Sequence, residues 1–242
     1  MKIALIGYGK MGHIIERIAL ERGHEIVSKV DVDNQEEFES EAFASADVAI
    51  EFTIPAKAVE NYRKAWAAGV PVVSGTTGWN SVLPELKEEI AANGYTLFWA
   101  SNFSLGVNLF FELNKRLAQM MNRYANYDVA MTEIHHTEKK DAPSGTGLMM
   151  ANEVTQIRKD AELVFGRTPL SEKRKPQEIG IHAIRGGGYV GEHEIDFINE
   201  NEVIKITHEA FSKSVFADGA LKAAKFIANK PANLYEMKNL FE

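Results

Sequence analysis

Residues 133–146 combine two adjacent histidines, a pair of lysines and a Pro-Ser-Gly-Thr corner in one short stretch. Histidine exchanges protons near neutral pH, and lysine attracts anions. An apolar run follows Ser144, Gly145 and Thr146, which indicates a helix start. Unpaired N–H groups and the helix dipole favour an anion at such a start. The stretch therefore predicts a pocket that holds a small, doubly negative acid and protonates a group beside it.

The histidines and lysines can divide this work. Either His135 or His136 can donate the proton, and Lys139 provides a point charge for a carboxylate. Two other interpretations stay open: a structural histidine pair beside solvated lysines, and a metal site that includes Glu133. Adjacent side chains on an extended chain point to opposite sides and make a poor chelate, so we expect no metal.

The bulk composition narrows the class of protein. The chain has 242 residues, of which 45% are hydrophobic and 25% charged, as is usual for globular domains. Its formal net charge of −7 disfavours a general nucleic-acid or anionic-membrane binder. It contains no cysteine, which excludes disulfides and thiolate nucleophiles. No apolar run approaches the roughly 20 residues that span a bilayer, and no signal region follows Met1, so we expect a soluble cytoplasmic protein.

The N-terminal residues have the pattern of a dinucleotide-binding unit. A short apolar strand at 2–6 runs into a GxGxxG turn at 7–12, followed by a helix, a strand at 25–30 and Asp31. The glycines allow a close approach of the backbone to a pyrophosphate, and the acid binds a ribose diol. Asp31 favours NADH over NADPH, although Lys29 lies close in sequence and weakens that inference. The alternative is a glycine turn in an α/β domain without a nucleotide.

Strands then alternate with helices, which is typical of a doubly wound parallel sheet. Residues 34–46 are acidic and poorly patterned, and we interpret them as a surface connection with room for one short helix. A second glycine-rich turn at 75–78 follows a strand and lies at the carboxyl edge of the sheet, where ligands bind in this architecture. The expected strands are 47–52, 70–74 and 95–100, and the expected helices are 55–68 and 83–92.

The pattern changes after residue 104 to a strand-rich region that also contains helices. The expected helices are 105–125, 147–158 and 215–229, the strands are 127–134, 179–184, 193–198 and 203–208, and 166–178 is a basic loop. We therefore expect an α/β protein with a Rossmann-type doubly wound parallel sheet, residues 1–104 plus 215–242, which binds the dinucleotide. A second α+β domain with a mixed or antiparallel sheet, residues 105–214, serves substrate binding and oligomerisation.

These motifs resemble those of the 4-hydroxy-tetrahydrodipicolinate reductase family, also called dihydrodipicolinate reductase, of bacterial diaminopimelate and lysine biosynthesis. The His-His-x-x-Lys-x-Asp-Ala-Pro-Ser-Gly-Thr block is the most specific part, and the resemblance covers essentially the full chain. Further blocks stand in family order at 7–12, 75–78, 101–104, 185–193 and 216–220. The resemblance implies reduction of a cyclic imine diacid to tetrahydrodipicolinate with NADH or NADPH. It also implies a homotetramer in which the second-domain sheets form the central contact.

The resemblance also implies roles for individual residues. His135 is the proton donor, and Lys139 anchors the substrate and assists the transfer. The substrate carboxylates are assigned to His136, Gly145 and Thr146, with Ser144 at the same corner. The cofactor phosphates lie along Gly7, Gly9, Lys10, Met11 and Gly12, and the adenosine ribose lies at Asp31. The nicotinamide lies near Gly75, Thr76, Thr77, Ala100, Asn102 and Phe103.

One position departs from the family pattern. Lys213 stands where the family often has an arginine, and we expect it to bind substrate as a point charge instead of a bidentate fork. Either the affinity for the diacid is lower or another cation, such as Arg185, compensates. Lys140 leaves two candidates for the substrate lysine, and the spacing from the histidine pair favours Lys139.

Two competing functions share parts of this sequence pattern. The first is a Rossmann dehydrogenase for another small acid, which would have GxGxxG without the tandem-histidine block. The second is a nucleotide-sensing protein without turnover, against which the acid, the anchor and the anion corner argue. The choice between NADH and NADPH, regulation and the extent of domain closure are open at the level of sequence. Closure is expected, because hydride and proton must reach one substrate from different domains.

Overall fold

The structure, a computed structural model, is described for residues 1–241, and the chain divides into two units. The first unit is discontinuous and consists of Met1–Leu105 and Lys213–Glu242, whereas the second is the continuous segment Gly106–Ser212. Across residues 1–241, no helix has the length and apolar character needed to cross a membrane.

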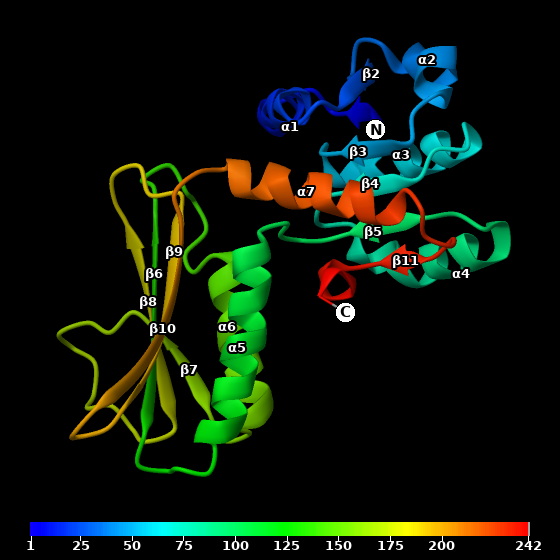
Figure 1. The fold of residues 1–242 in the computed structure, drawn as a ribbon. Coiled ribbons are helices and arrows are strands. Elements are labelled where there is room, and N and C mark those ends of the chain that lie inside the picture. Colours follow the sequence, from blue (N-terminus) through cyan, green and yellow to red (C-terminus); the bar gives the residue numbers. More distant parts are fainter. Residues whose placement is uncertain (242) are drawn as a thin grey trace. The chain divides into compact units, whose positions relative to one another are not determined.

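The first unit is built on a six-stranded parallel sheet with the strand order β11-β5-β4-β3-β1-β2 (Figure 1). Its strands are β1 (Lys2–Ile6), β2 (Glu25–Val30), β3 (Val48–Glu51), β4 (Val72–Ser74), β5 (Leu97–Trp99) and β11 (Leu234–Tyr235). Its α-helices are α1 (Lys10–Glu21), α2 (Glu41–Ala44), α3 (Pro55–Ala67), α4 (Leu83–Asn93) and α7 (Ser214–Ile227). Three short 3₁₀ segments complete it: η1 (Gln35–Glu39), η2 (Asn80–Val82) and η3 (Met237–Leu240).

Two hydrophobic cores cover the two faces of this sheet. Ile3 and Leu5 of β1 pack with α1 and α7, while Ala4 and Ile6 pack with α3 and α4. Successive strand residues point to opposite faces, so a strand that is buried on both faces must be apolar throughout. This requirement explains the uninterrupted apolar run of β1. Because helices cover both faces of the sheet, ligands bind in this architecture at the loops that follow the carboxyl ends of the strands.

The second unit is a five-stranded mixed sheet with two helices, and its strand order is β10-β9-β6-β8-β7. Its strands are β6 (Asp128–His135), β7 (Glu162–Phe165), β8 (Glu178–Arg185), β9 (Gly191–Ile198) and β10 (Val203–Ala210), and its helices are α5 (Leu105–Met121) and α6 (Gly145–Ile157). The central strand β6 runs parallel to β8 and antiparallel to β9. A tight hairpin joins β9 to β10, as the sequence predicts.

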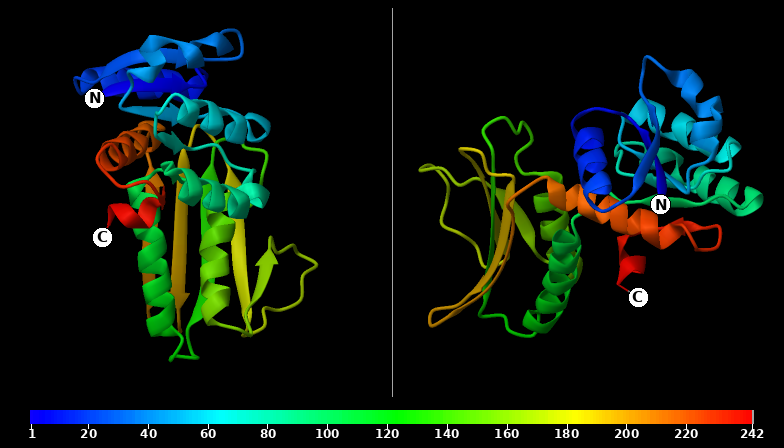
Figure 2. Two further views of the ribbon diagram at one scale, coloured as in Figure 1. Left: turned by 90° about the vertical axis from the view of Figure 1, so that its right-hand side faces the viewer. Right: turned by 45° about the horizontal axis from the view of Figure 1, so that its top comes forward.

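Both helices of the second unit cover the same face of its sheet (Figures 1 and 2). Phe110 of α5 and Met150 of α6 share a core with Met131 and Ile195 of the sheet. The outward residues of β6 and β9 alternate with this core and are half-exposed. No helix of residues 106–212 covers that second face, which therefore stays accessible within this unit.

The expected fold class is confirmed, and the differences are local. Strands β7 and β11 are additional to the predicted strands; both are short and lie at sheet edges, where little alternation is needed. The acidic segment at 34–46 contains η1 and α2, and it buries Phe38 and Phe43. Helix α6 begins at Gly145, earlier than the predicted start at residue 147, because Ser144 caps it.

Candidate active site

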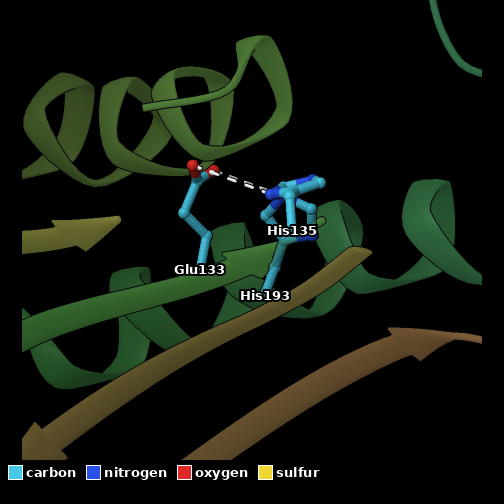
Figure 3. Close-up of side chains that lie close together, drawn as sticks. All are labelled: Glu133, His135 and His193. Carbon is cyan, nitrogen blue, oxygen red and sulfur yellow. Dashed lines mark ion pairs between the residues drawn. The ribbon is translucent and has the colours of Figure 1, made fainter. Parts of the chain in front are cut away.

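Strand β6 brings Glu133 and His135 to one face of its sheet, since residues two apart on a strand share a face. Both are buried, with exposed fractions of 1% and 7%. The Nδ1 atom of His135 lies 3.8 Å from Oε1 of Glu133 (Figure 3). His136 follows the end of the strand and is half-buried; its N–H donates to the carbonyl oxygen of Tyr189 at 2.8 Å. The tandem histidines therefore occupy different environments.

Ser144 joins the start of helix α6 to the Glu133 carboxylate. Its N–H donates to both oxygens of Glu133, at 2.9 and 3.0 Å, and its hydroxyl donates to Oε2 of the same residue. As the N-cap, that hydroxyl also accepts from the Gly147 N–H at 3.0 Å. The sequence predicts unpaired N–H groups at this helix start, but the N–H group of Ser144 is paired, because it donates to the buried carboxylate. Among the described residues, no partner is found for the N–H groups of Gly145 and Thr146.

Arg185 supplies the positive charge that faces Glu133. It ends β8, and its Nη2 donates to Oε1 of Glu133 at 2.7 Å and to the carbonyl oxygen of Asp141. Its Nη1 donates to the carbonyl oxygen of Ile184 at 2.8 Å. The guanidinium is thus committed to groups within the unit, which argues against Arg185 as the substitute for the family arginine at position 213.

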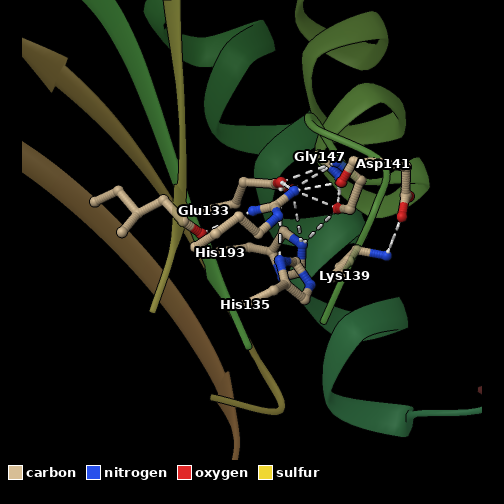
Figure 4. A network of polar contacts seen from close by, with 9 residues as sticks. Glu133, His135, Lys139, Asp141, Gly147 and His193 are labelled. Carbon is tan, nitrogen blue, oxygen red and sulfur yellow. Dashed lines mark hydrogen bonds and ion pairs between the residues drawn. The ribbon is translucent and has the colours of Figure 1, made fainter. Parts of the chain in front are cut away.

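His193 completes the cluster from the neighbouring strand. It is the register partner of Glu133 across the β6–β9 pair, and its Nε2 lies 3.6 Å from Oε2 of Glu133 and 3.2 Å from the Ser144 hydroxyl (Figure 4). Its ring meets the His135 ring edge-on, with 5.0 Å between the centroids. The sequence pattern did not single out Glu133 and His193 as a pair, because their partnership depends on the register between two strands.

Glu133, His135 and His193 offer ligand atoms within 4.8 Å of one another, which is the spacing of a metal site. However, Ser144 and Arg185 already donate to both carboxylate oxygens of Glu133. The Arg185 guanidinium and three hydrogen bonds from Ser144 thus neutralise the Glu133 carboxylate, as a metal ion would otherwise do. We interpret the cluster as an internal ionic network.

The network holds two displaced pKa values. Burial raises the pKa of Glu133, but the contacts with His193, Ser144 and Arg185 outweigh it and bring the pKa to about 2. Burial lowers the pKa of His135 to about 4, against the opposing attraction of Glu133 and with the repulsion of His193, Lys139 and Arg185. A displaced histidine beside an anion-ready helix start is typical of a catalytic acid or base.

Lys139 follows the tandem histidines in a turn. Its N–H donates to the carbonyl oxygen of His136 at 3.1 Å, and its Nζ donates to the carboxylate of Asp141 at 2.8 and 3.0 Å. The hydrogen bond from Lys139 lowers the pKa of Asp141. The predicted anchor therefore lies in the loop that follows β6, and its charge is paired with the aspartate two residues away (Figure 4).

The glycine turn of the first unit has the geometry that its sequence predicts. Gly7 has a φ of 89°, and a Cβ there would lie 2.2 Å from the carbonyl oxygen of Phe52. A Cβ at Gly12 would lie 2.5 Å from the Gly7 carbonyl oxygen, whereas Gly9 faces open space at the start of α1. The turn borders a cavity of about 530 Å³ that is also lined by Asp31. Lys10 is exposed and Met11 half-buried on the first turn of α1.

Asp31 and Lys29 have different surroundings at the end of β2. Asp31 is exposed, and its carboxylate accepts from the N–H groups of Tyr8 at 3.3 Å and Val32 at 2.9 Å. Lys29 pairs with Glu16 and donates to the Tyr8 hydroxyl at 3.1 Å. The hydrogen bond with Glu16 raises the pKa of Lys29. The acid thus faces the cavity region while the lysine is occupied by a neighbouring carboxylate.

A buried carboxylate that the sequence did not single out underlies the second glycine-rich turn. Glu51, at the end of β3, accepts from Ser74 at 2.6 Å, from Thr76 at 2.9 Å and from Thr53. Burial raises the pKa of Glu51, and these hydrogen bonds act in the opposite direction. The Thr76 hydroxyl is thus turned inward, while Thr77 is exposed. A Cβ at Gly75 would lie 2.1 Å from the ring of Phe52.

The remaining predicted residues lie at the carboxyl end of β5 and at the start of α7. Ala100 and Phe103 are buried, and the Phe103 ring lies 5.8 Å from that of Phe52. Asn102 is half-buried, and its side-chain oxygen accepts from the Ser104 N–H at 2.9 Å. Lys213 is exposed at the N-cap position of α7 and belongs to the first unit.

Comparison with known proteins gives matches along the whole chain. The family model described as "Dihydrodipicolinate reductase, N-terminus" matches residues 1–103, and "Dihydrodipicolinate reductase, C-terminus" matches residues 106–241. The 4-hydroxy-tetrahydrodipicolinate reductase of Staphylococcus aureus strain MRSA252 is 40% identical over 246 residues, covering 99% of this chain and 100% of that protein. The corresponding protein of strain JH9 is 39% identical with the same coverage.

Solved structures show the same fold. A dipicolinate-bound dihydrodipicolinate reductase from Paenisporosarcina sp. TG-14 aligns with a TM-score of 0.73 and 22% identity, covering 98% of this chain and 97% of that chain. An amine dehydrogenase from Mycobacterium smegmatis aligns with a TM-score of 0.54 and 13% identity, covering 97% and 94%. At these identities, the likenesses concern the fold alone.

Proposed function

Because the chain belongs to the dihydrodipicolinate reductase family, we propose that its glycine turn and its tandem-histidine network divide that family's reaction between them. The activity is the NAD(P)H-dependent reduction of 4-hydroxy-tetrahydrodipicolinate, a step of diaminopimelate and lysine biosynthesis. In our proposal, residues 1–104 plus 215–242 bind the cofactor, and residues 105–214 bind the substrate. The observation that carries the proposal is a buried histidine beside a helix start with two unpartnered N–H groups.

His135 is the proton donor of this proposal. A nicotinamide transfers a hydride, so an acid must protonate the other end of the reduced bond. The depressed pKa of about 4 leaves His135 neutral at neutral pH in the unliganded protein. A substrate with two carboxylates favours the protonated form, because a nearby anion stabilises an imidazolium. His135 thus becomes an acid when the substrate arrives.

The substrate carboxylates have two sets of donors in the second unit. The first is the start of α6, where the N–H groups of Gly145 and Thr146 lack partners among the described residues and the helix dipole attracts an anion. The second is Lys139, for which a substrate carboxylate competes with Asp141. His136 and Lys213, which belongs to the first unit, complete the set. Ser144 supports this pocket from beneath, as the cap that holds the helix start on Glu133.

The cofactor phosphates lie along Gly7, Gly9, Lys10, Met11 and Gly12 in this proposal, since a Cβ at Gly7 or Gly12 would meet neighbouring backbone. The nicotinamide lies near Gly75, Thr76, Thr77, Ala100, Asn102 and Phe103. NADH is favoured over NADPH, because Asp31 repels a 2′-phosphate and Lys29 is paired with Glu16. Initial rates with each cofactor on one preparation test this preference, and an equal kcat/KM for both would contradict it.

We further propose a homotetramer in which the open sheet faces of the second units meet. The outward residues of β6 and β9 are half-exposed, and no helix of that unit covers them. An uncovered sheet face is a natural site for contact with a second copy. Light scattering measures the assembly directly, and a mass other than four times the 27.0 kDa of one chain would contradict the tetramer.

The decisive experiment follows NADH oxidation with 4-hydroxy-tetrahydrodipicolinate generated enzymatically in the cuvette. The wild-type protein should turn over, and His135→Ala should lose roughly 100-fold or more in kcat with its affinity for NADH unchanged. A His135→Ala variant that keeps the height and shape of the wild-type pH–rate profile would remove His135 from the mechanism. Turnover of another keto or imino acid, without turnover of this diacid, would contradict the activity itself.

A further inference from the structure

Glu133 lies at the centre of the cluster yet has no part in the chemistry described so far. Its side chain is only 1% exposed. Its carboxylate lies beside four side chains or caps, those of His135, Ser144, Arg185 and His193 (Figures 3 and 4). Burying a charged carboxylate costs several kcal/mol unless it is paired. Besides these structural contacts, the carboxylate lies 3.8 Å from the ring of the proposed proton donor, a position from which it can act on that ring.

The two ring nitrogens of His135 have different surroundings. Nδ1 is buried, lies 3.8 Å from Oε1 of Glu133 and has no hydrogen-bond partner. Nε2 lies beside the backbone of Gly191, where an added Cβ would be 3.1 Å away, and no protein group among the described residues bonds to it. The carboxylate thus occupies the side of the ring that carries Nδ1. It leaves Nε2 as the nitrogen that can reach a substrate.

We propose that Glu133 is a positioning residue for proton transfer, which holds the His135 imidazole with Nδ1 toward its carboxylate and Nε2 toward the substrate. The proposal rests on the assignment of His135 as the proton donor. When bound, the nicotinamide would supply a hydride, with its electron pair, to one end of the reduced bond. The Nε2 proton of the imidazolium passes to the other end. His135 is left neutral with its remaining proton on Nδ1, and solvent restores the proton on Nε2.

The same carboxylate connects the donor to the carboxylate-binding helix start. Ser144 caps α6, and both its N–H group and its hydroxyl donate hydrogen bonds to Glu133. Gly147 allows this approach, because a Cβ there would lie 2.5 Å from Oε2 of Glu133. Glu133 therefore fixes the distance between the proton donor and the N–H groups of Gly145 and Thr146, which set the position of the substrate.

The charged groups that face His135 make the proposal testable by pH. Glu133 of β6 attracts a proton to the imidazole, whereas His193 of β9, Lys139 of the following loop and Arg185 of β8 repel it. Removal of the carboxylate should therefore move the loss of activity at high pH to lower pH. Removal of the arginine should move it to higher pH. A residue that only supported the fold would lower activity without these opposite shifts.

The experiment compares Glu133→Gln with Arg185→Gln, with kcat at saturating diacid measured from pH 5 to 9, because kcat reports the pKa of the substrate complex. In Glu133→Gln, kcat should fall roughly 10- to 100-fold, the high-pH limb should shift down by roughly one pH unit, and NADH affinity should be unchanged. In Arg185→Gln, the same limb should shift up. Coincident limbs for Glu133→Gln and wild type, or shifts of both variants in one direction, would overturn the proposal.

A measurement on the wild-type protein avoids any loss of folding in the variants. In protein labelled with ¹⁵N-histidine, the His135 signals can be assigned by their absence in His135→Ala. The neutral form should carry its proton on Nδ1 and not on Nε2. A neutral His135 protonated on Nε2 would overturn the role of Glu133. If His135 were not the proton donor, His135→Ala would keep the wild-type pH profile, whereas the tautomer of the wild-type ring would still report its contact with Glu133. The two failures can therefore be told apart.

Discussion

Replacement of Gly147 by alanine tests whether the helix cap and the buried carboxylate form one unit. The added Cβ would lie 2.5 Å from Oε2 of Glu133, 3.3 Å from its Cδ and 3.5 Å from the Ser144 hydroxyl. The first distance is about 1 Å short of ordinary contact, so the carboxylate or the first turn of α6 has to move. Neither can move freely, because Ser144 and Arg185 hold the carboxylate. Overpacking at such a site costs about 1–3 kcal/mol.

Gly145 offers a matched control in the same helix. No atom lies within 4 Å of a Cβ added there, and neither glycine has a positive φ. Alanine at Gly145 should leave stability unchanged or raise it by roughly 0.5–1 kcal/mol, since it restricts the unfolded chain. Thermal unfolding by calorimetry should show Gly147→Ala melting several degrees below wild type, at about 2–4 °C for each kcal/mol in a chain of this size. Equal melting temperatures for both variants would refute the tight contact.

Other predictions follow from the same contacts. Gly191→Ala places a Cβ 3.1 Å from Nε2 of His135 and should lower kcat roughly 10-fold without changing the Kd for NADH, as measured by stopped-flow kinetics and calorimetry. Gly7→Ala should abolish NADH binding by calorimetry while diacid binding persists, because its Cβ would meet the Phe52 carbonyl oxygen at 2.2 Å. Asp31→Ser should raise the KM for NADH and lower that for NADPH, since it removes a carboxylate that repels the 2′-phosphate.

The stability of the second unit should fall in acid in two overlapping stages. His135 resists protonation in the folded state, with a pKa of about 4, so stability is complete above pH 6.5 and decreases as pH falls toward 4. Glu133 resists protonation as well, with a pKa of about 2, so a second loss follows as pH falls from 4.5 toward 2. Each displacement is worth about 3 kcal/mol, and contact between the two groups makes the losses non-additive. Urea unfolding at pH 7, 5 and 3 measures the trend, and a flat profile would contradict it.

Periodicity predicted the fold well wherever burial imposes a clear pattern. Strand β1 is buried on both faces and reads as an unbroken apolar run, while β6 alternates because one of its faces is open. Strands β7 and β11 escaped prediction because each adds only an edge to its sheet, and a short edge strand needs no full apolar face. The glycine turn was predictable for a related reason: close backbone contacts at Gly7 and Gly12 exclude a side chain there.

The candidate site shows what local sequence cannot supply. His135, Lys139 and the helix start are adjacent in the chain, so their types and spacing indicated an acid, an anchor and an anion corner. Their electrostatic balance is set by Arg185 and His193, which lie 52 and 60 residues after Glu133 and approach it only through the strand pairing β8-β6-β9. A shift of one residue in either pairing would turn these side chains to the other face of the sheet.

That dependence on register explains why the N–H group of Ser144 is paired while those of its two neighbours are not. From sequence, all three N–H groups of the helix start are equivalent and free. In the fold, the nearest one meets a carboxylate that the strand presents from beneath, and the next two remain available. The internal carboxylate thus takes the position that a ligand would otherwise fill, with a geometry fixed before any substrate binds. A site that must bind a dianion and protonate it gains from this arrangement, because the anchor of the helix start and the orientation of the acid come from one residue.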